Sequence, residues 1–369
     1  MILMYVRRCL LKMGKTLIAA LLGGILFKLL HAPIPWLLGP MLAVLIGSKI
    51  FGRTSAFRWS SSVRNSGMIT VGYTIGLAMT ASAIEEMSHQ LMSMVLMIVL
   101  LLLFCAGMAF VVAKLSGTDF KTALLGSVPG GLTQVLALAE ETEGVNVTIV
   151  TVTQVIRLMM IIVCIPIVVF SPLLGGSHDT GGAVAELHHA AATWSGLLPG
   201  MLWFAPVAIG CAVLGNRVNF PTAYLLGPAI GTAVLQLCGL EGPALPAFLI
   251  DAAQLMIGAY VGLLLKPEQL ENKLRTISLA VGSGLLLIVG AWGFSLLLTK
   301  LYPISMPTAL LSLAPGGMDQ MGIIAHEIDA DLSMVAGYQL FRMFFIFFAV
   351  PPLLRLLFRR SLKRSSSEG

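Results

Sequence analysis

One stretch of the sequence occurs twice and decides the fold: residues 123–134 read ALLGSVPGGLTQ, and residues 309–320 read ALLSLAPGGMDQ. In both copies the tripeptide Pro-Gly-Gly breaks an apolar run. Proline lacks a backbone N–H donor, and glycine accepts the backbone angles of a tight turn. The apolar arms beside the break are about nine residues long, whereas a helix needs about 20 residues to cross a bilayer. We therefore expect each copy to form a hairpin of two short helices.

The composition indicates an integral membrane protein. Of 369 residues, 57% are hydrophobic and 11% are charged, whereas about 25% are charged in ordinary soluble domains. The apolar segments are about 18 to 25 residues long, which suits helices that cross a hydrocarbon core of roughly 30 Å. None has the alternating pattern of barrel strands. The sequence therefore predicts an all-α polytopic membrane protein.

The duplication extends over almost the whole chain. Residues 33–40 read PIPWLLGP and return as PTAYLLGP at 221–228, and residues 72–77 read GYTIGL and return as GAYVGL at 258–263. The distance along the chain between matching motifs is nearly constant. Repetition of several motifs in the same order predicts two homologous halves.

The domain boundaries follow from this repetition. We predict a first membrane repeat at 15–174, a linker rich in Gly, His and Ala at 175–196, a second membrane repeat at 197–358 and a basic cytoplasmic tail at 359–369. The linker contains no Lys or Arg.

The two Leu-Leu-Gly-Pro motifs predict kinked, closely packed spans. Pro40 and Pro228 are expected to kink these spans, and Gly39 and Gly227 remove the side chain that would hold a neighbouring helix away. We expect the neighbours to be the two hairpins.

Two topologies are compatible with the duplication. If residues 120–139 and 307–325 cross the membrane completely, each half has six spans and the two halves are parallel. If these segments dip in and return, each half has five spans plus one re-entrant Pro-Gly-Gly hairpin, and the repeats are inverted. The second scheme leaves only Lys28 and Lys300 outside. Because basic loop residues favour the cytoplasmic side, we expect inverted repeats with both termini cytoplasmic.

A buried Gln-x-x-Arg pattern follows each hairpin. Gln154 precedes Arg157 by three residues, and Gln339 precedes Arg342 by three residues, so each pair shares one helical face. A charged residue within a span costs about 3 kcal/mol on insertion scales and therefore usually faces a partner or a cavity. The pairs could brace the broken backbone of the hairpins, or they could bind a carboxylate or another small anion.

The hairpin turns add further candidate ligands. The N-terminus of a half-helix has free N–H groups and a positive dipole end, which favour an anion. Thr133-Gln134 in the first copy becomes Asp319-Gln320 in the second. Asp319 is either a protonatable or cation-binding carboxylate or a helix cap. The predicted substrate-binding residues are Pro129, Gly130, Gly131, Thr133, Gln134, Gln154, Arg157, Pro315, Gly316, Gly317, Asp319, Gln320, Gln339 and Arg342.

Several classes of function are disfavoured. The five cysteines and six histidines are dispersed without a zinc-ligand spacing, and no nucleophile elbow, Walker loop or dinucleotide fingerprint occurs in its proper context. We therefore expect no enzyme, no metal ion and no cofactor. No soluble segment is long enough for a DNA-reading domain, so the net charge of +6 indicates cytoplasmic loops and not direct binding of nucleic acid.

Four motifs carry a resemblance to a known family: PWLLGP at 35–40, PGGLTQ at 129–134, YLLGP at 224–228 and APGGMDQM at 314–321. With these motifs the chain resembles the AbrB family of duplicated bacterial membrane proteins, which differs from the small DNA-binding regulator of the same name. The resemblance implies a multi-pass protein of the bacterial cytoplasmic (inner) membrane. The family carries the labels of regulator of AidB expression and, for some members, ammonia monooxygenase. The dispersed histidines fit the second label poorly.

The sequence predicts a secondary transporter or channel for a small polar or anionic solute. The alternative is a membrane sensor that binds the same ligand and affects gene expression indirectly, as the family label implies. The expected partners are a small-molecule or ion ligand and the lipid bilayer, and a homo-oligomer is compatible with the sequence.

Overall fold

The computed structural model describes residues 2–32, 34–50, 57–130, 132–142, 144–170, 198–218, 220, 222–264 and 273–365. All regular structure in these ranges is α-helical. The predicted linker at 175–196 lies outside the described residues. The predicted tail begins within the last helix, which continues to Ser365.

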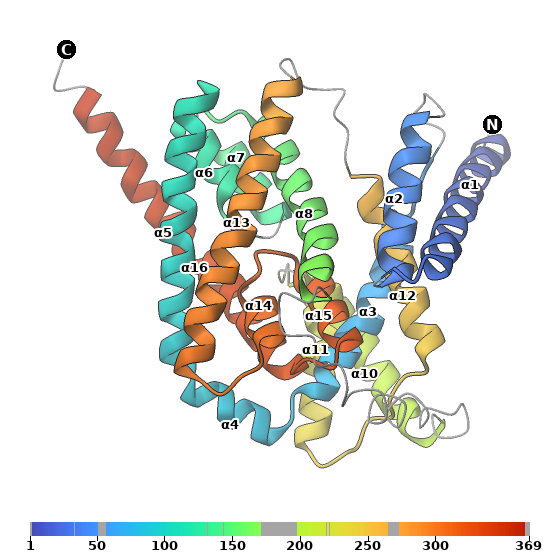
Figure 1. Ribbon diagram of the computed structural model, residues 1–369. Helices are drawn as coiled ribbons and strands as arrows, with labels where there is room; N and C mark the ends of the chain where they lie inside the picture. The colour runs from blue at the N-terminus through green and yellow to red at the C-terminus, as the bar shows by residue number, and fades with distance from the viewer. Residues whose placement is uncertain are drawn as a thin grey trace.

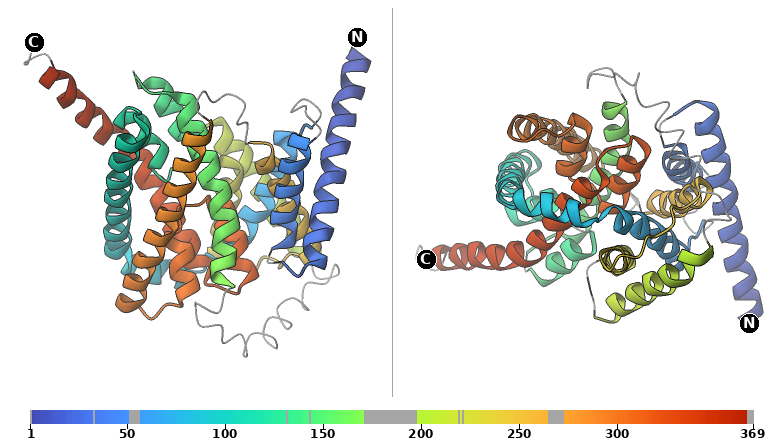
Figure 2. Two further views of the ribbon diagram at one scale, coloured as in Figure 1. Left: turned by 45° about the horizontal axis from the view of Figure 1, so that its top comes forward. Right: turned by 90° about the horizontal axis from the view of Figure 1, so that it is seen from below.

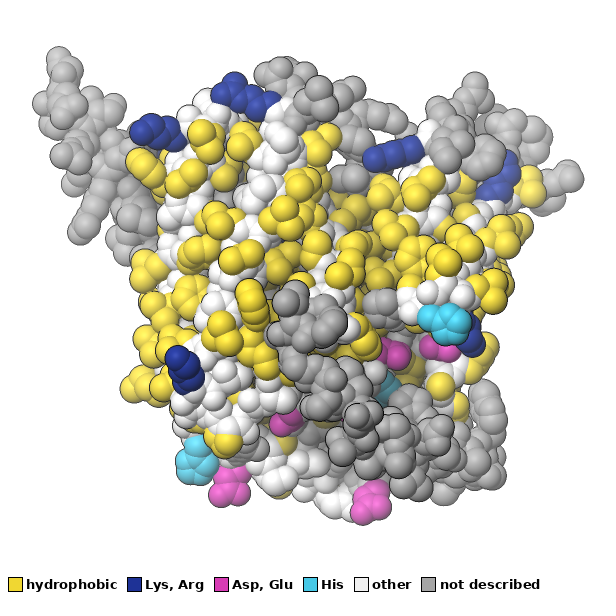
Figure 3. Space-filling model, viewed as in Figure 1, with side chains coloured by type: hydrophobic (Ala, Val, Ile, Leu, Met, Phe, Trp, Pro, Cys, Tyr) yellow, Lys and Arg dark blue, Asp and Glu magenta, His cyan; other side chains and the backbone are white. Residues whose placement is uncertain are grey.

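Within the described ranges, three helices are long and apolar enough to cross a membrane: α5 (Leu91–Ser116), α8 (Val147–Val169) and the segment Arg275–Leu301 of α13 (Lys273–Leu301). The outward faces of α5 and α13 expose large apolar side chains such as Phe110 and Val289. A broad band of apolar side chains crosses the visible face of the molecule (Figure 3). Such surfaces suit lipid and not water. The protein is therefore all-helical and membrane-embedded, as the composition predicted.

The helices form two groups that lie side by side (Figures 1 and 2). We call the first group the hairpin bundle; it consists of α5, α6 (Phe120–Ser127), α7 (Leu132–Glu141), α8, α13, α14 (Met306–Leu313), α15 (Met318–Glu327) and α16 (Leu332–Ser365). We call the second group the glycine bundle; it consists of α1 (Ile2–Leu29), α2 (Pro35–Ile50), α3 (Ser61–Ala78), α10 (Leu198–Arg217), α11 (Ala223–Leu237) and α12 (Ala247–Gly262). The short helix α4 (Ala81–His89) connects α3 to α5.

Within the hairpin bundle, the chain breaks at both Pro-Gly-Gly tripeptides. The pair α6 and α7 lies at the end of the molecule where α5 ends and α8 begins, whereas α14 and α15 lie at the opposite end, where α13 ends (Figure 1). Both hairpins start at a capped N-terminus: Asp119 accepts a hydrogen bond from the backbone N–H of Lys121, and Ser305 accepts one from Thr308. These caps satisfy N–H groups that have no partner within the helix.

The glycine bundle is held by contacts between helix backbones. A Cβ added at Gly72 of α3 would clash with the carbonyl oxygen of Leu225 on α11, and one added at Gly258 of α12 would clash with that of Leu37 on α2. Each glycine helix therefore packs on the Leu-Leu-Gly-Pro helix of the other half. Without a strong hydrophobic drive between helices in lipid, such close van der Waals contact becomes the main source of stability.

The predicted role of the Leu-Leu-Gly-Pro glycines needs a correction. Gly39 touches the backbone of Gly23 on α1, and Gly227 touches the backbone of Cys211 on α10. The close approach is therefore to the first helix of the same half, and not to the hairpins. The reason is geometric, because a small residue on each of two consecutive helices allows them to form a tight helix pair.

Candidate functional site

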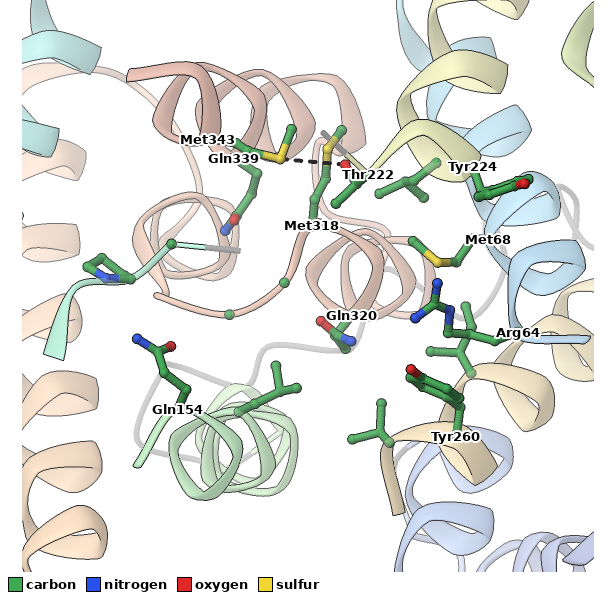
Figure 4. Close-up of a pocket in the computed structure, with 18 of the residues that line it drawn as sticks. Arg64, Met68, Gln154, Thr222, Tyr224, Tyr260, Met318, Gln320, Gln339 and Met343 are labelled. Carbon is green, nitrogen blue, oxygen red and sulfur yellow. Dashed lines mark hydrogen bonds between the residues drawn. The ribbon is translucent and has the colours of Figure 1, made fainter. Parts of the chain in front are cut away.

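The two Pro-Gly-Gly breaks meet at one cavity of about 390 Å³ between the hairpin bundle and the glycine bundle (Figure 4). This volume is within the range of small-molecule sites, about 300–1,000 Å³. The predicted residues that line the cavity are Pro129, Gly130, Gln154, Arg157, Pro315, Gly316, Gly317, Gln320, Gln339 and Arg342.

Four predicted residues are not fully described. Gly131 lies outside the described residues, and so do the side chains of Thr133, Gln134 and Asp319. Their backbone begins α7 and α15, directly after the two breaks.

Gln154 and Arg157 bind the carbonyl groups at the end of α6. Arg157 Nη1 donates to the oxygens of Ser127 (3.2 Å) and Val128 (3.0 Å), and Gln154 Nε2 donates to those of Leu125 (2.7 Å) and Val128 (3.1 Å). The last carbonyls of a helix have no partner within it and form the negative end of its dipole. A guanidinium is therefore well suited to this position.

Gln339 and Arg342 repeat the arrangement at the end of α14. Arg342 Nη1 donates to the oxygen of Ala314 (2.6 Å) and Nη2 to that of Gly316 (2.8 Å), while Gln339 Nε2 donates to those of Leu311 (2.7 Å) and Ala314 (3.1 Å). In both halves the glutamine Oε1 also accepts a hydrogen bond from the arginine Nη2. We call each set a Gln-Arg brace.

These contacts are the ones that the brace interpretation predicts. Arg157 is 6% exposed and Arg342 is 5% exposed, and their Nη groups donate to the broken backbone and to the glutamine of the same brace. Arg157 Nε is buried and has no acceptor within the described part of the chain. Both residues still line the cavity, so the braces contribute positive charge to it.

The opposite wall contains residues that sequence reasoning missed. Arg64 and Met68 come from α3, Tyr224 from α11, and Tyr260 from α12 (Figure 4). Arg64 directly precedes an apolar span, where arginine is common on the cytoplasmic side, so it was not among the predicted site residues. The structure places it inside the first turn of α3, facing the cavity.

The side chain of Arg64 is held in a defined orientation. Its Nε and Nη2 both donate to Asn65 Oδ1, at 3.2 and 2.8 Å, and its Cζ lies 4.5 Å from the ring centroid of Tyr260. A guanidinium above an aromatic face is attracted by the ring quadrupole. Nη1 has no acceptor among the described residues.

The charged side chains in the described lining of the cavity are all arginines. The N-cap of α15 is Gly317, which has no side chain, and the first-turn residues Met318 and Gln320 line the cavity. The positive end of this helix dipole adds to the charge of three arginines, and no Asp or Glu belongs to the described lining. In the described ranges, no three His, Cys, Asp or Glu side chains lie close enough together to bind a metal ion.

The lining of the cavity includes Tyr260, in the last turn of α12, and Leu264, two residues after this helix ends. One to two turns earlier, Gln254 Nε2 donates to Glu327 Oε1 of α15 at 2.7 Å. Beside this contact, Gly322 of α15 packs on Ile75 of α3. Thr222, directly before α11, also donates to Met343 Sδ of α16 at 3.5 Å (Figure 4), so the two bundles contact each other at more than one place around the cavity.

Fold and site together define a class of protein: a helical membrane protein in which two broken-helix hairpins meet at an internal, positively charged cavity. The sequence profile of the family described as transition state regulatory protein AbrB matches residues 36–358. The chain belongs to this family.

Two relatives cover nearly the whole chain. The chain is 26% identical over 370 residues to the "Uncharacterized protein YhjN" of Bacillus subtilis (strain 168), with 94% of each protein covered. It is 27% identical over 370 residues to the "Putative regulator AbrB" of Escherichia coli (strain K12), with 96% of this chain and 99% of that protein covered. No solved structure matches the chain.

Proposed function

We propose that the protein is a secondary transporter or channel for a small polar or anionic solute, and not an enzyme. The observation that carries this proposal is the cavity at which two discontinuous helices meet between two bundles. Transporters with internal repeats bind their substrates at such broken helices, near the middle of the membrane. The free helix ends and the arginines supply the positive charge that an anionic solute requires.

The proposed topology is a pair of inverted repeats, each with five spans and one re-entrant hairpin, in the bacterial cytoplasmic membrane with both termini cytoplasmic. The arrangement of the hairpins at opposite ends of the molecule supports it (Figure 1). So does the charge distribution. Lys and Arg side chains gather at the end of the molecule that carries both chain ends (Figure 3), as expected for a cytoplasmic side.

Transport would follow from movement of the hairpin bundle relative to the glycine bundle. Gln254 of the glycine bundle donates a hydrogen bond to Glu327 of the hairpin bundle, and this contact would break and re-form as the bundles move and expose the site to each side in turn. Rigid-body movement of one bundle against another is the usual form of alternating access.

Flux measurements test the proposal. The full-length protein is reconstituted into vesicles, and uptake of radiolabelled organic and inorganic anions is compared with that of empty vesicles. Saturable uptake that is lost in the variant Arg64→Gln supports a transporter. Absence of uptake for every anion and neutral polar solute tested would contradict it.

Single cysteines test the topology. Cysteine is introduced at Glu141 and at Asp329 in a background without the native cysteines, and each is labelled from either side of the membrane. Inverted repeats predict that residue 141 reacts from the cytoplasmic side and residue 329 from the outside. Labelling of both from the same side would require parallel repeats.

The second candidate function is a membrane sensor that affects gene expression indirectly. The observation that favours it is the family description and the regulator name of the Escherichia coli relative. A sensor would bind a ligand in the same cavity with saturation but would move none across the vesicle membrane, and its deletion would change the expression of target genes.

A further inference from the structure

The positive charges around the cavity are of two kinds. The Gln-Arg braces occur in both halves and bind broken backbone in both, so the fold itself requires them. Arg64 has no such counterpart. The repeat that aligns Asn65 with Asp251 places Ile250 at the position of Arg64. Because the second half folds with isoleucine there, the fold does not require a cation, and Arg64 needs a different explanation.

The contacts of Arg64 leave one edge of its guanidinium available. Asn65 Oδ1 occupies the Nε and Nη2 edge, and the ring of Tyr260 covers one face. The edge formed by Nη1 and the second N–H of Nη2 has no described acceptor and is directed into the cavity (Figure 4). This edge presents two parallel N–H donors, which is the geometry that binds a carboxylate through both oxygens. Contacts that fix the side chain before binding reduce the entropy lost on binding.

The hairpin bundle supplies the other side of the same site. Gln320, in the first turn of α15, points toward Arg64 across the cavity (Figure 4). The N-terminal residues of α15 and Arg157 also border this space. An anion at Arg64 would therefore contact both bundles at once.

Much of the remaining lining is apolar. Met68, Leu158, Ile257, Val261 and Met343 border the cavity. A ligand that only carried charge would leave these side chains in contact with water, whereas an organic tail would cover them. The volume of about 390 Å³ is sufficient for such a tail.

We propose that the cavity binds a small organic carboxylate, whose two oxygens accept hydrogen bonds from the Nη1 and Nη2 edge of Arg64 and whose apolar part packs on the methionine and aliphatic lining. The inference rests on the proposed function in that it names the substrate class of the same site. In the described lining, the two brace arginines are bound to backbone carbonyls and Arg64 has an edge without an acceptor, and this single cation favours a monocarboxylate over a polyanion.

Matched pairs of compounds test the charge requirement. Purified full-length protein in detergent is titrated with benzoate and hexanoate, and with the neutral amides benzamide and hexanamide, and thermal unfolding is followed at each concentration. A ligand that binds only the folded state raises Tm in a concentration-dependent way. We expect saturable stabilisation by the carboxylates and at least about tenfold weaker binding of the amides, because a hydrogen-bonded charge is lost.

Variants of Arg64 test the assignment to this residue. Arg64→Gln should weaken carboxylate binding by about tenfold to a hundredfold. Arg64→Lys should recover part of the affinity, since it restores the charge without the two-donor edge. Arg275→Gln is the matched control, because Arg275 is an exposed arginine outside the cavity. The Tm of each variant without ligand reports whether it is folded, and Asn65→Ala gives a second, milder test by releasing the guanidinium.

Three results would overturn the inference: no stabilisation of the wild type by either carboxylate, equal binding of carboxylates and amides, or unchanged binding in Arg64→Gln. The vesicle flux experiment distinguishes failure of the carboxylate inference from failure of the proposed transport function. Carboxylate binding that depends on Arg64 without any flux would contradict transport and leave the site intact. Flux of a neutral or cationic solute without carboxylate binding would support transport and contradict the carboxylate site.

Discussion

The two bundles of this protein accommodate the polar backbone at membrane depth in opposite ways. In the glycine bundle the helices stay whole, and their backbones touch directly at residues such as Gly72 and Gly258. In the hairpin bundle two helices are broken, and the side chains of Arg157 and Arg342 bind the exposed carbonyls. The glycine backbone contacts and the arginine-bound helix breaks each occur in both halves of the chain.

The difference shows what each bundle is suited to do. Intact helices in close contact pair most of their backbone N–H and C=O groups within each helix. Broken helices expose N–H and C=O groups, which are tolerated at membrane depth only where protein or a cavity surrounds them. The cavity lies between the two bundles. The hairpin bundle contributes helix ends to its lining, and the glycine bundle contributes Arg64 and Tyr260.

The largest expected effect is loss of a Gln-Arg brace. Arg342→Leu removes hydrogen bonds to the carbonyls of Ala314 and Gly316 and leaves these groups buried. Hydrogen bonds to charged groups contribute about 1.5–3 kcal/mol each, so we expect a loss of roughly 3–5 kcal/mol in the free energy of unfolding. Thermal unfolding in detergent measures it. The exposed Arg275→Leu is the control, and equal Tm values for the two variants would contradict the brace.

The next largest expected effect on stability is a steric clash in the glycine bundle. Gly72→Ala puts a methyl group against the carbonyl oxygen of Leu225, so two helices must separate or bend. Overpacking of this kind costs typically about 1–3 kcal/mol. Gly107→Ala on α5 is the matched control, since nothing lies within 4 Å of its Cβ position, and alanine favours the helix there by about 1 kcal/mol. Opposite signs of the two Tm shifts are expected, and a destabilised Gly107→Ala with a neutral Gly72→Ala would refute the packing argument.

The smallest effect concerns the boundary between the bundles. Gln254→Leu removes the hydrogen bond to Glu327, which is exposed, so the expected loss is about 1 kcal/mol. We expect faster amide exchange in α15, because its contact with α12 is weakened, and little change in α8. Glu85→Gln, on the exposed face of α4, serves as the control. Unchanged exchange in α15 would show that this hydrogen bond does not hold the bundles together.

The sequence singled out the residues that the structure brings together at the two helix breaks, for a specific reason. A proline, two glycines and a charged residue are all unfavourable inside an apolar span, so their presence in both copies requires a structural cause. The residues Gln154, Arg157, Gln339 and Arg342 therefore stood out, and the structure brings them to one cavity with the two breaks.

The other side of the site could not be predicted in the same way. Arg64 precedes an apolar span, a position where arginine is common in membrane proteins, so it carried no signal of its own. Tyr260 is an ordinary aromatic residue within a span. Their pairing joins α3 to α12, and nothing in the local sequence of either helix indicates the other.

The sequence by itself determined the class of protein, the two halves, the positions of the helix breaks and the side chains that bind the broken backbone. These features depend on local chemistry, since apolar runs, Pro-Gly-Gly breaks and buried charges have the same consequence wherever they occur in a membrane protein. Only the tertiary structure decided that each glycine helix packs on the other half of the chain, and that Arg64 faces the hairpin ends. Those contacts join residues distant in sequence, and helix packing in lipid depends on the shape of both surfaces and not on either one alone.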